Sequence, residues 1–160
     1  NKEKFLQKVD MIRGIIPDVS LTTDIIVGFP GETDDDFQDT MNIVKYVEFD
    51  SVYMFQFSPR PGTKAYDMED EFVNQDIIKK RFQHLKDVQT DISEKRLKRY
   101  VGTKQLLLIE KPSKKNNRVL TGKIDSGQIT HIDKKNVSIG DIVQVKITDS
   151  TPFYLKAELI

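Results

Sequence analysis

The stretch TDIIVGFPGE at residues 23–32 decides the fold of the first half of this chain. The β-branched residues 25–27 suit a strand that is buried on both faces. Gly28 and Gly31 allow a sharp turn that exposes backbone toward a ligand. Thr33 and Asp36 then have the spacing of a helix capping box, so we attribute the acidic residues 34–36 to helix capping rather than to a metal site. Such a strand–turn–helix junction is a common cofactor site in α/β enzymes.

The residues around this stretch alternate between helical and strand patterns. The expected elements are a helix over residues 3–16 that stops at Pro17, a strand over 21–28, a helix after Thr33, and a second buried strand over 51–58. A rigid Pro-Arg-Pro-Gly turn follows at residues 59–62. This order predicts parallel strands covered by helices. Two strands alone would leave an open edge and an uncovered apolar face, through which we expect the chain to self-associate.

The second half has a different pattern. A long amphipathic helix from Asn74 to about Tyr100 should connect the two halves. Beyond Gly102, five short β-rich runs are separated by polar turns, at residues 105–110, 119–124, 128–132, 142–148 and 153–159. Five short strands in so small a module predict an antiparallel β-barrel. The predicted fold class is therefore α/β plus all-β, with domains at residues 1–96 and 97–160.

The composition excludes several kinds of chemistry within these residues. The 160-residue chain has no cysteine, which rules out disulfides, thiolate catalysis and sulfur-ligated metals. His84 and His131 are the only imidazoles, and we expect both to be structural or surface residues. No catalytic residue and no metal ligand can be assigned. No apolar run approaches the length of a membrane span.

The formal net charge of zero hides an uneven distribution of charge. Residues 1–96 hold 13 basic and 19 acidic side chains, whereas residues 97–160 hold 12 basic and 6 acidic ones. The basic half suits a polyanionic partner, although a run of charge is more often only a solvated face. The candidate phosphate contacts are Lys104, Lys111, Lys114, Lys115, Arg118, Lys123, Lys134 and Lys135. Tyr100, Phe153 and Tyr154 are candidates for stacking on bases, and we expect the small core to take at least one of them.

Four ordered motifs carry a resemblance to a known family. They are TTDIIVGFPGET at residues 22–33, SPRPGT at 58–63, QTDIS at 89–93 and LKAEL at 155–159. With these motifs the chain resembles the radical S-adenosylmethionine methylthiotransferases, most of all the branch that acts on dimethylallyl-adenosine in tRNA. The resemblance implies that residues 1–96 are the C-terminal part of a partial (β/α) barrel. It implies that residues 97–160 are a TRAM domain, which is a small OB-like barrel.

The resemblance also implies an activity for a longer parent protein. Such an enzyme uses S-adenosylmethionine and two 4Fe-4S clusters to add a methylthio group to the adenine ring of a hypermodified adenosine next to the anticodon. The cluster cysteines would lie before Asn1, so we expect this chain alone to bind no cofactor and to be inactive. The implied partners are the tRNA anticodon stem-loop and the remaining N-terminal domains of the same protein. The implied location is the cytoplasm, with no membrane contact.

The same resemblance suggests where the cofactor and the substrate would bind. The strand that ends at Gly28 would flank the adenine of S-adenosylmethionine, so the candidate cofactor contacts are Asp24, Ile26, Val27, Gly28 and Phe29. Ile26 and Val27 are alternatively plain core, which we expect of at least one of them. Asp24 either faces the barrel lumen as a polar site residue or pairs with a basic side chain. Arg60 follows a barrel strand and is a candidate contact for substrate phosphate, with a turn-stabilising role as the alternative.

Three other functions compete with the favoured one. The chain resembles, in part, enzymes that act on threonylcarbamoyl-adenosine in tRNA and enzymes that modify a ribosomal protein. It is alternatively a non-catalytic RNA-binding module. Asp24 and Arg60 favour the tRNA-directed branches, because the ribosomal-protein branch usually lacks both residues. An upstream Cys-x-x-x-Cys-x-x-Cys motif would establish the radical enzyme.

Overall fold

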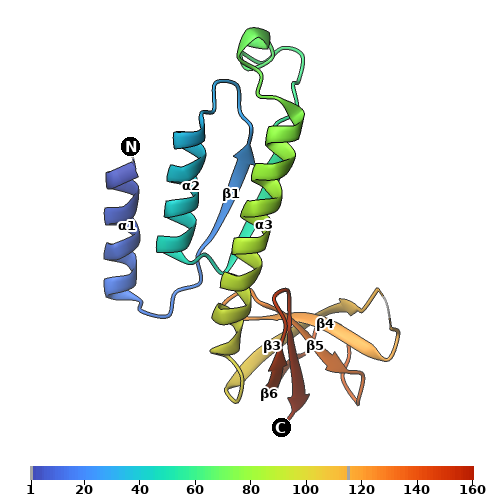
Figure 1. The fold of residues 1–160 in the computed structure, drawn as a ribbon. Coiled ribbons are helices and arrows are strands. Elements are labelled where there is room, and N and C mark those ends of the chain that lie inside the picture. Colours follow the sequence, from blue (N-terminus) through green and yellow to red (C-terminus); the bar gives the residue numbers. More distant parts are fainter. Residues whose placement is uncertain (1, 115) are drawn as a thin grey trace. The chain divides into compact units, whose positions relative to one another are not determined.

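The computed structural model describes residues 2–114 and 116–160, which form two compact units, Asn1–Ile92 and Ser93–Ile160 (Figure 1). The first unit contains helices and a parallel sheet, and the second contains a closed barrel. The expected combination of an α/β part and an all-β part is therefore confirmed. Among the residues that the structure describes, no helix combines the length and the apolar character that a membrane crossing needs.

The first unit follows the predicted order of elements. Its elements are α1 (Lys2–Ile15), β1 (Thr22–Val27), α2 (Asp34–Val47), β2 (Ser51–Gln56), a short 3₁₀ helix η1 (Glu69–Glu71) and most of α3 (Gln75–Lys98). As expected, α3 connects the halves, since it contributes Leu85 and Ile92 to the first core and Leu97 to the second. The predicted domain boundary between residues 96 and 97 falls in the last turn of this helix and stays a prediction.

The start of α2 confirms the predicted capping box. The Thr33 Oγ1 atom accepts a hydrogen bond from the Asp36 backbone N–H at 3.2 Å, and Asp36 Oδ2 accepts one from the Thr33 N–H at 3.0 Å. These bonds satisfy donors that the first turn of a helix otherwise leaves unpaired. The Thr33 hydroxyl also donates to Asp36 Oδ2 at 2.6 Å, and this bond, together with that from the Thr33 N–H, lowers the pKa of the Asp36 carboxyl. The helix ends at Glu48, which has a left-handed φ of 46° and donates its N–H to the Val44 carbonyl.

The sheet of the first unit has two parallel strands, β1 and β2. Helices α1, α2 and α3 contribute apolar side chains to a core on one face, together with Val27 and Val52. The other face is uncovered, and Ile26, Tyr53 and Phe55 there are 51%, 60% and 53% exposed. The uncovered apolar face that two strands alone predict is therefore confirmed, whereas the burial on both faces that their residues suit does not occur within this chain, because its helices cover one face only. Self-association through this sheet stays a prediction.

The second unit is a closed barrel of five strands. They are β3 (Lys104–Pro112), β4 (Val119–Ile124), β5 (Ile129–Asp133), β6 (Ile142–Ser150) and β7 (Leu155–Leu159), in the order β3-β4-β5-β7-β6. Four pairings are antiparallel, but β5 and β7 are parallel. The prediction of a purely antiparallel barrel is thus wrong at one place. After β5 the chain crosses to form β6, which pairs with β3, and then returns through a hairpin. Strand β7 pairs with both β6 and β5, and it runs parallel to β5.

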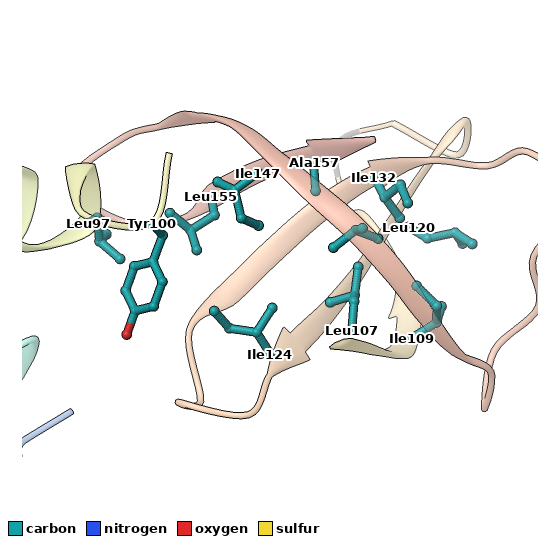
Figure 2. Packing of buried hydrophobic residues seen from close by; sticks show 11 residues of the cluster. Leu97, Tyr100, Leu107, Ile109, Leu120, Ile124, Ile132, Ile147, Leu155 and Ala157 are labelled. Atoms are coloured by element: carbon teal, nitrogen blue, oxygen red, sulfur yellow. The ribbon is translucent and has the colours of Figure 1, made fainter. Parts of the chain in front are cut away.

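Inward and outward side chains alternate along the strands, and the inward ones form the barrel core. In β3 the side chains of Leu107 and Ile109 point inward and are buried, while their neighbours Leu106 and Leu108 are exposed. Figure 2 shows these inward residues packed with the buried side chains of the other strands and with Leu97 and Tyr100. Tyr100 therefore belongs to the core, as expected for at least one of the three candidate stacking aromatics. Lys111, expected in a loop, lies in β3 opposite Thr121.

Close approach of two strands requires glycine at residue 122. A Cβ atom on Gly122 would lie 2.0 Å from the Leu108 carbonyl oxygen, which belongs to the backbone and cannot turn aside. We predict that Gly122→Ala destabilises the protein by about 1–3 kcal/mol through overpacking, measured by urea unfolding. Gly14→Ala is the control, because nothing lies within 4 Å of the added Cβ and alanine favours a helix. Equal stability of the two variants would contradict the close approach.

Candidate functional site

The turn after β1 has the geometry that its glycines predict. Gly28 and Gly31 both have a φ of 78°, a conformation that other residues rarely adopt. A Cβ atom on Gly28 would lie only 2.4 Å from the Ile78 Cγ1 atom of α3. The Gly31 N–H donates to the Glu71 carbonyl at 2.9 Å. The turn is thus packed closely against α3 and bound to the segment of η1.

A buried arginine from α3 holds this turn. Arg81 Nη1 donates to Glu32 Oε1 at 2.6 Å and to the Glu32 carbonyl at 3.1 Å, and Nη2 donates to Asp34 Oδ1 at 2.6 Å. The second oxygen of the Glu32 carboxylate accepts from the Gly28 N–H at 3.0 Å. Burial alone lowers the pKa of Arg81, but the bonds to Asp34 and Glu32 outweigh it and the pKa is raised. The guanidinium is therefore a permanent cation that joins both ends of the turn.

Sequence reasoning misses Arg81, although the chain contains a signal for it. Helix α3 has an apolar stripe that includes Ile78, Phe82 and Leu85, and Arg81 lies within this stripe. A charged residue on the buried face of a helix requires a partner, because an unpaired buried charge is costly. Helix capping accounts for only part of the acidic run after Gly31. Asp36 has that role, whereas Asp34 binds Arg81.

The structure separates the candidate cofactor contacts. Val27 is core, and the Gly28 N–H is already bound by Glu32. Asp24 and Ile26 are exposed on the uncovered face of β1, opposite Tyr53 and Phe55 in the parallel register. No ion pair joins Asp24 to a basic side chain among the described residues, so the pairing alternative does not hold within them.

Phe29 and Arg60 lie beyond the strand ends. Phe29 is about half exposed and contacts Phe57 edge to face, with 5.5 Å between ring centroids, and Phe57 contacts Phe72 in the same way at 5.6 Å. The side chain of Arg60 is exposed. Its backbone carbonyl, rather than its guanidinium, holds the following turn by accepting from the N–H and the hydroxyl of Thr63. No group of three or more potential metal ligands occurs in residues 2–114 and 116–160.

We predict that Arg81→Ala destabilises the first unit by about 3 kcal/mol or more, because it leaves the Glu32 carboxylate buried without its cation. The Glu32 side chain is 12% exposed, whereas Asp34 is 95% exposed and loses little. Lys79→Ala removes another ion pair of the same helix, with Asp76, whose side chains are 66% and 80% exposed. Exposed pairs contribute about 0–1 kcal/mol, so this control should unfold in urea like the wild type. Similar unfolding midpoints for the two variants would refute a structural role of the buried pair.

One end of the barrel brings two basic segments together. One is the loop between β3 and β4, and the other is the loop after β5. The Lys134 N–H donates to the Arg118 carbonyl at 2.8 Å, and these loops carry the exposed side chains of Lys114, Arg118, Lys134 and Lys135. The first loop is closed by bonds from the Ser113 N–H to the Val119 carbonyl and from the Arg118 N–H to Asn116 Oδ1. We call Lys114, Arg118, Lys134 and Lys135 the basic end. Lys115 belongs to the same predicted set but lies outside the described residues.

Two other predicted phosphate contacts lie elsewhere. Lys104 begins β3 and pairs with Lys146, roughly 20 Å along the strand from Lys111. Lys123 lies near the far end of β4, opposite Leu108. Lys123 is two residues from Thr121, the register partner of Lys111, so among the described members of the predicted set it is Lys104 that lies far from Lys111.

A row of outward side chains runs across all five strands. Lys111, Thr121, His131, Lys156 and Asp149 are consecutive register partners on β3, β4, β5, β7 and β6. We call them the outer row. Thr121 Oγ1 and His131 Nδ1 are 2.9 Å apart, and Lys156 Nζ lies 2.8 Å from Asp149 Oδ2. His131 also contacts Tyr154 edge to face, with ring centroids 4.5 Å apart. His84, by contrast, is an exposed residue of α3, as expected.

Partial burial of His131 makes the stability of the protein depend on pH. Burial lowers the pKa of its imidazole below 6.5, although a hydrogen bond with the Leu120 backbone acts in the opposite direction. The folded protein therefore binds a proton less readily than the unfolded chain. The stability that this residue contributes is complete above pH 6.5 and is lost as the pH falls below that value.

We predict that the melting temperature falls less steeply in His131→Gln than in the wild type between about pH 7 and about pH 5, because only the wild type takes up a proton at this position on unfolding. Circular dichroism melts across this range measure the effect. Glutamine retains a polar side chain next to Thr121. Parallel curves for the two proteins would show that His131 titrates alike in both states.

Comparison with known proteins adds two findings to this geometry. The TRAM domain family matches residues 98–160, which include all five strands of the barrel. Residues 98–160 are a TRAM domain. Over 159 residues the chain is 42% identical to proteins named tRNA-2-methylthio-N(6)-dimethylallyladenosine synthase from Corynebacterium jeikeium and Geobacillus kaustophilus. The alignments cover 98% and 99% of this chain but 31% and 30% of those relatives.

A protein of the same name from Clostridium botulinum is also 42% identical, over 160 residues that make up 100% of this chain and 35% of the relative. The similarity thus extends over the first unit as well as the TRAM domain. The chain spans about a third of the length of the curated relatives that it matches.

Proposed function

We propose that this chain is part of a tRNA-modifying methylthiotransferase and that its TRAM domain binds the tRNA. The similarity to the three named synthases supports the first statement. The observation that carries the second is the basic end, where the Lys134–Arg118 backbone bond brings two cationic loops together. Clustered exposed cations bind phosphates by displacing counterions, and small barrels of this type commonly bind oligonucleotides.

The tRNA anticodon stem-loop is the partner that this proposal implies. The basic end offers lysine and arginine side chains without a fixed arrangement of base-reading groups, which suits phosphate positioning rather than sequence recognition. Lys104 and Lys123 lie outside the basic end, and Lys104 is too far along β3 to contact the same phosphates directly. The affinity contributed by the basic end should therefore depend on salt and little on base sequence.

We propose that the first unit, with its two-stranded sheet, supplies part of the cofactor and substrate site. Asp24 and Ile26 are exposed on the uncovered face of β1, and Phe29 is exposed beyond the end of this strand. Ile26 and Phe29 offer apolar surface for an adenine ring, and Asp24 offers an acceptor for hydroxyl groups. In such a reaction S-adenosylmethionine supplies the radical and the methyl group. The chain contains no cysteine, so none of its residues is assigned to an iron–sulfur cluster. Arg81 positions the turn that follows these contacts.

We predict that Arg118→Ala/Lys134→Ala weakens binding of an anticodon stem-loop, because it removes two cations that hold phosphates. The slope of log affinity against log salt should become shallower by roughly one unit for each phosphate that the variant no longer binds. Filter binding across a salt series measures both quantities. Lys104→Ala/Lys146→Ala is the matched control, since it removes the same charge from exposed register partners at the start of β3 and should change the slope less.

The outcomes of this experiment distinguish the candidate functions. Equal losses of affinity in the two double variants would mean that net charge, and not the basic end, attracts the RNA. Wild-type protein that binds no RNA but retains a ribosomal protein would replace the proposal with the ribosomal-protein branch of the resemblance.

A further inference from the structure

A groove on the outside of the TRAM domain lies beside the outer row. It has a volume of about 680 Å³, and its lining includes Lys111, Thr121, His131, Phe153, Tyr154 and Lys156. We call it the His131 groove. This volume is in the range of small-ligand sites in proteins, which are about 300–1,000 Å³. The groove lies wholly within the second unit.

The aromatic wall of the groove is held in place before any ligand binds. Thr151 Oγ1 accepts hydrogen bonds from the Phe153 N–H at 3.2 Å and the Tyr154 N–H at 3.1 Å, and the Thr151 N–H donates to the Tyr154 carbonyl at 2.9 Å. The Tyr154 ring contacts His131, whose Nδ1 is fixed by Thr121. A wall that is already ordered loses little conformational entropy on binding.

Phe153 extends this wall into solvent. Its side chain is 68% exposed, although burial of a phenylalanine ring is among the most favourable contributions to a core. The backbone bonds to Thr151 fix the position of this residue in the loop before β7. An exposed aromatic side chain beside a preformed groove is the usual arrangement for stacking on a base.

The charged groups of the groove limit the chemistry of its ligand. Lys111 and Lys114 lie on one part of the lining, and Lys114 belongs to the basic end. Lys156 is bound to Asp149, a bond that raises the pKa of the lysine, so it remains a cation within the outer row. Asp133 and Glu158 also line the groove and offer acceptors for amino groups. Aromatic rings, cations and carboxylates together suit a ligand with a flat base, amino donors and a phosphate.

We propose that the His131 groove binds one unpaired nucleotide of an RNA chain. The base lies against Phe153 and the His131–Tyr154 pair, and its phosphate lies near Lys111 and Lys114. A base within a double helix is covered on both faces by its neighbours, so only an unpaired nucleotide fits. This inference rests on the proposed function, because it assumes that the basic end brings RNA to the barrel, and it adds a site that contacts the base.

The test uses the full 160-residue chain and a fluorescent single-stranded oligoadenylate of about ten nucleotides, a length in the range that one such barrel binds. Fluorescence anisotropy gives the affinity of the wild type, Phe153→Ala and Ile142→Ala. The control is matched, because the Ile142 side chain is also 68% exposed and does not line the groove. We expect Phe153→Ala to bind about tenfold more weakly with an unchanged salt slope, since it removes stacking and leaves every phosphate-binding cation in place.

Two further measurements distinguish the groove from the basic end. A duplex of the same length should bind the wild type and Phe153→Ala equally, because its bases cannot enter the groove. His131→Gln should weaken binding of the single strand by severalfold and should leave binding of the duplex unchanged. Unchanged single-strand affinity in both groove variants, with the wild type binding RNA, would overturn this inference alone. A wild type that binds neither RNA would overturn the proposed function and the inference together.

Discussion

Insertion of β7 between β5 and β6 is the constraint on which the second unit depends. A linear series of antiparallel hairpins would leave β3 and β7 with unpaired edges. The return of β7 beside β5 closes the barrel at the cost of one parallel pairing. Closure then fixes two neighbouring rows of register partners. The inner row, Leu120, Ile132, Ala157 and Ile147, belongs to the core, and the outer row carries His131 and Lys156 to the surface. The surface chemistry of the barrel is therefore determined by the same pairings that bury its core.

The first unit differs from the closed barrel, because its two-stranded sheet is open and helices cover it on one side only. Three helices stabilise β1 and β2 from one face, and the other face presents aromatic and aliphatic groups around Asp24. The turn that follows β1 is held from helix α3. The buried Arg81 holds Glu32 and Asp34 from α3, and Glu32 in turn holds the Gly28 N–H. A rigid turn next to an uncovered face is a suitable frame for binding a small molecule.

Sequence alone predicts the local features well, because they depend on residues that are near each other in the chain. The capping box at Thr33, the parallel strands, the connecting helix and the number of barrel strands all follow from periodicity and turn residues. The parallel pairing of β5 with β7 does not follow, since no local pattern specifies which distant strand fills a gap. For the same reason the outer row is hidden in the sequence, as its members come from five separate strands. The partial burial of His131 and the bond between Lys134 and Arg118 both depend on that long-range register.

The two rings next to β7 have a consequence for how such a domain evolves. Phe153 and Tyr154 precede the first residue of β7, and the backbone bonds to Thr151 do not depend on which side chains stand at these two positions. His131, by contrast, is fixed in the middle of β5 by the barrel register. Replacement of the loop rings therefore changes the contact surface while the strand pairings of the barrel stay the same. Relatives of this domain can diverge in ligand preference through two loop positions, with the barrel itself inherited unchanged.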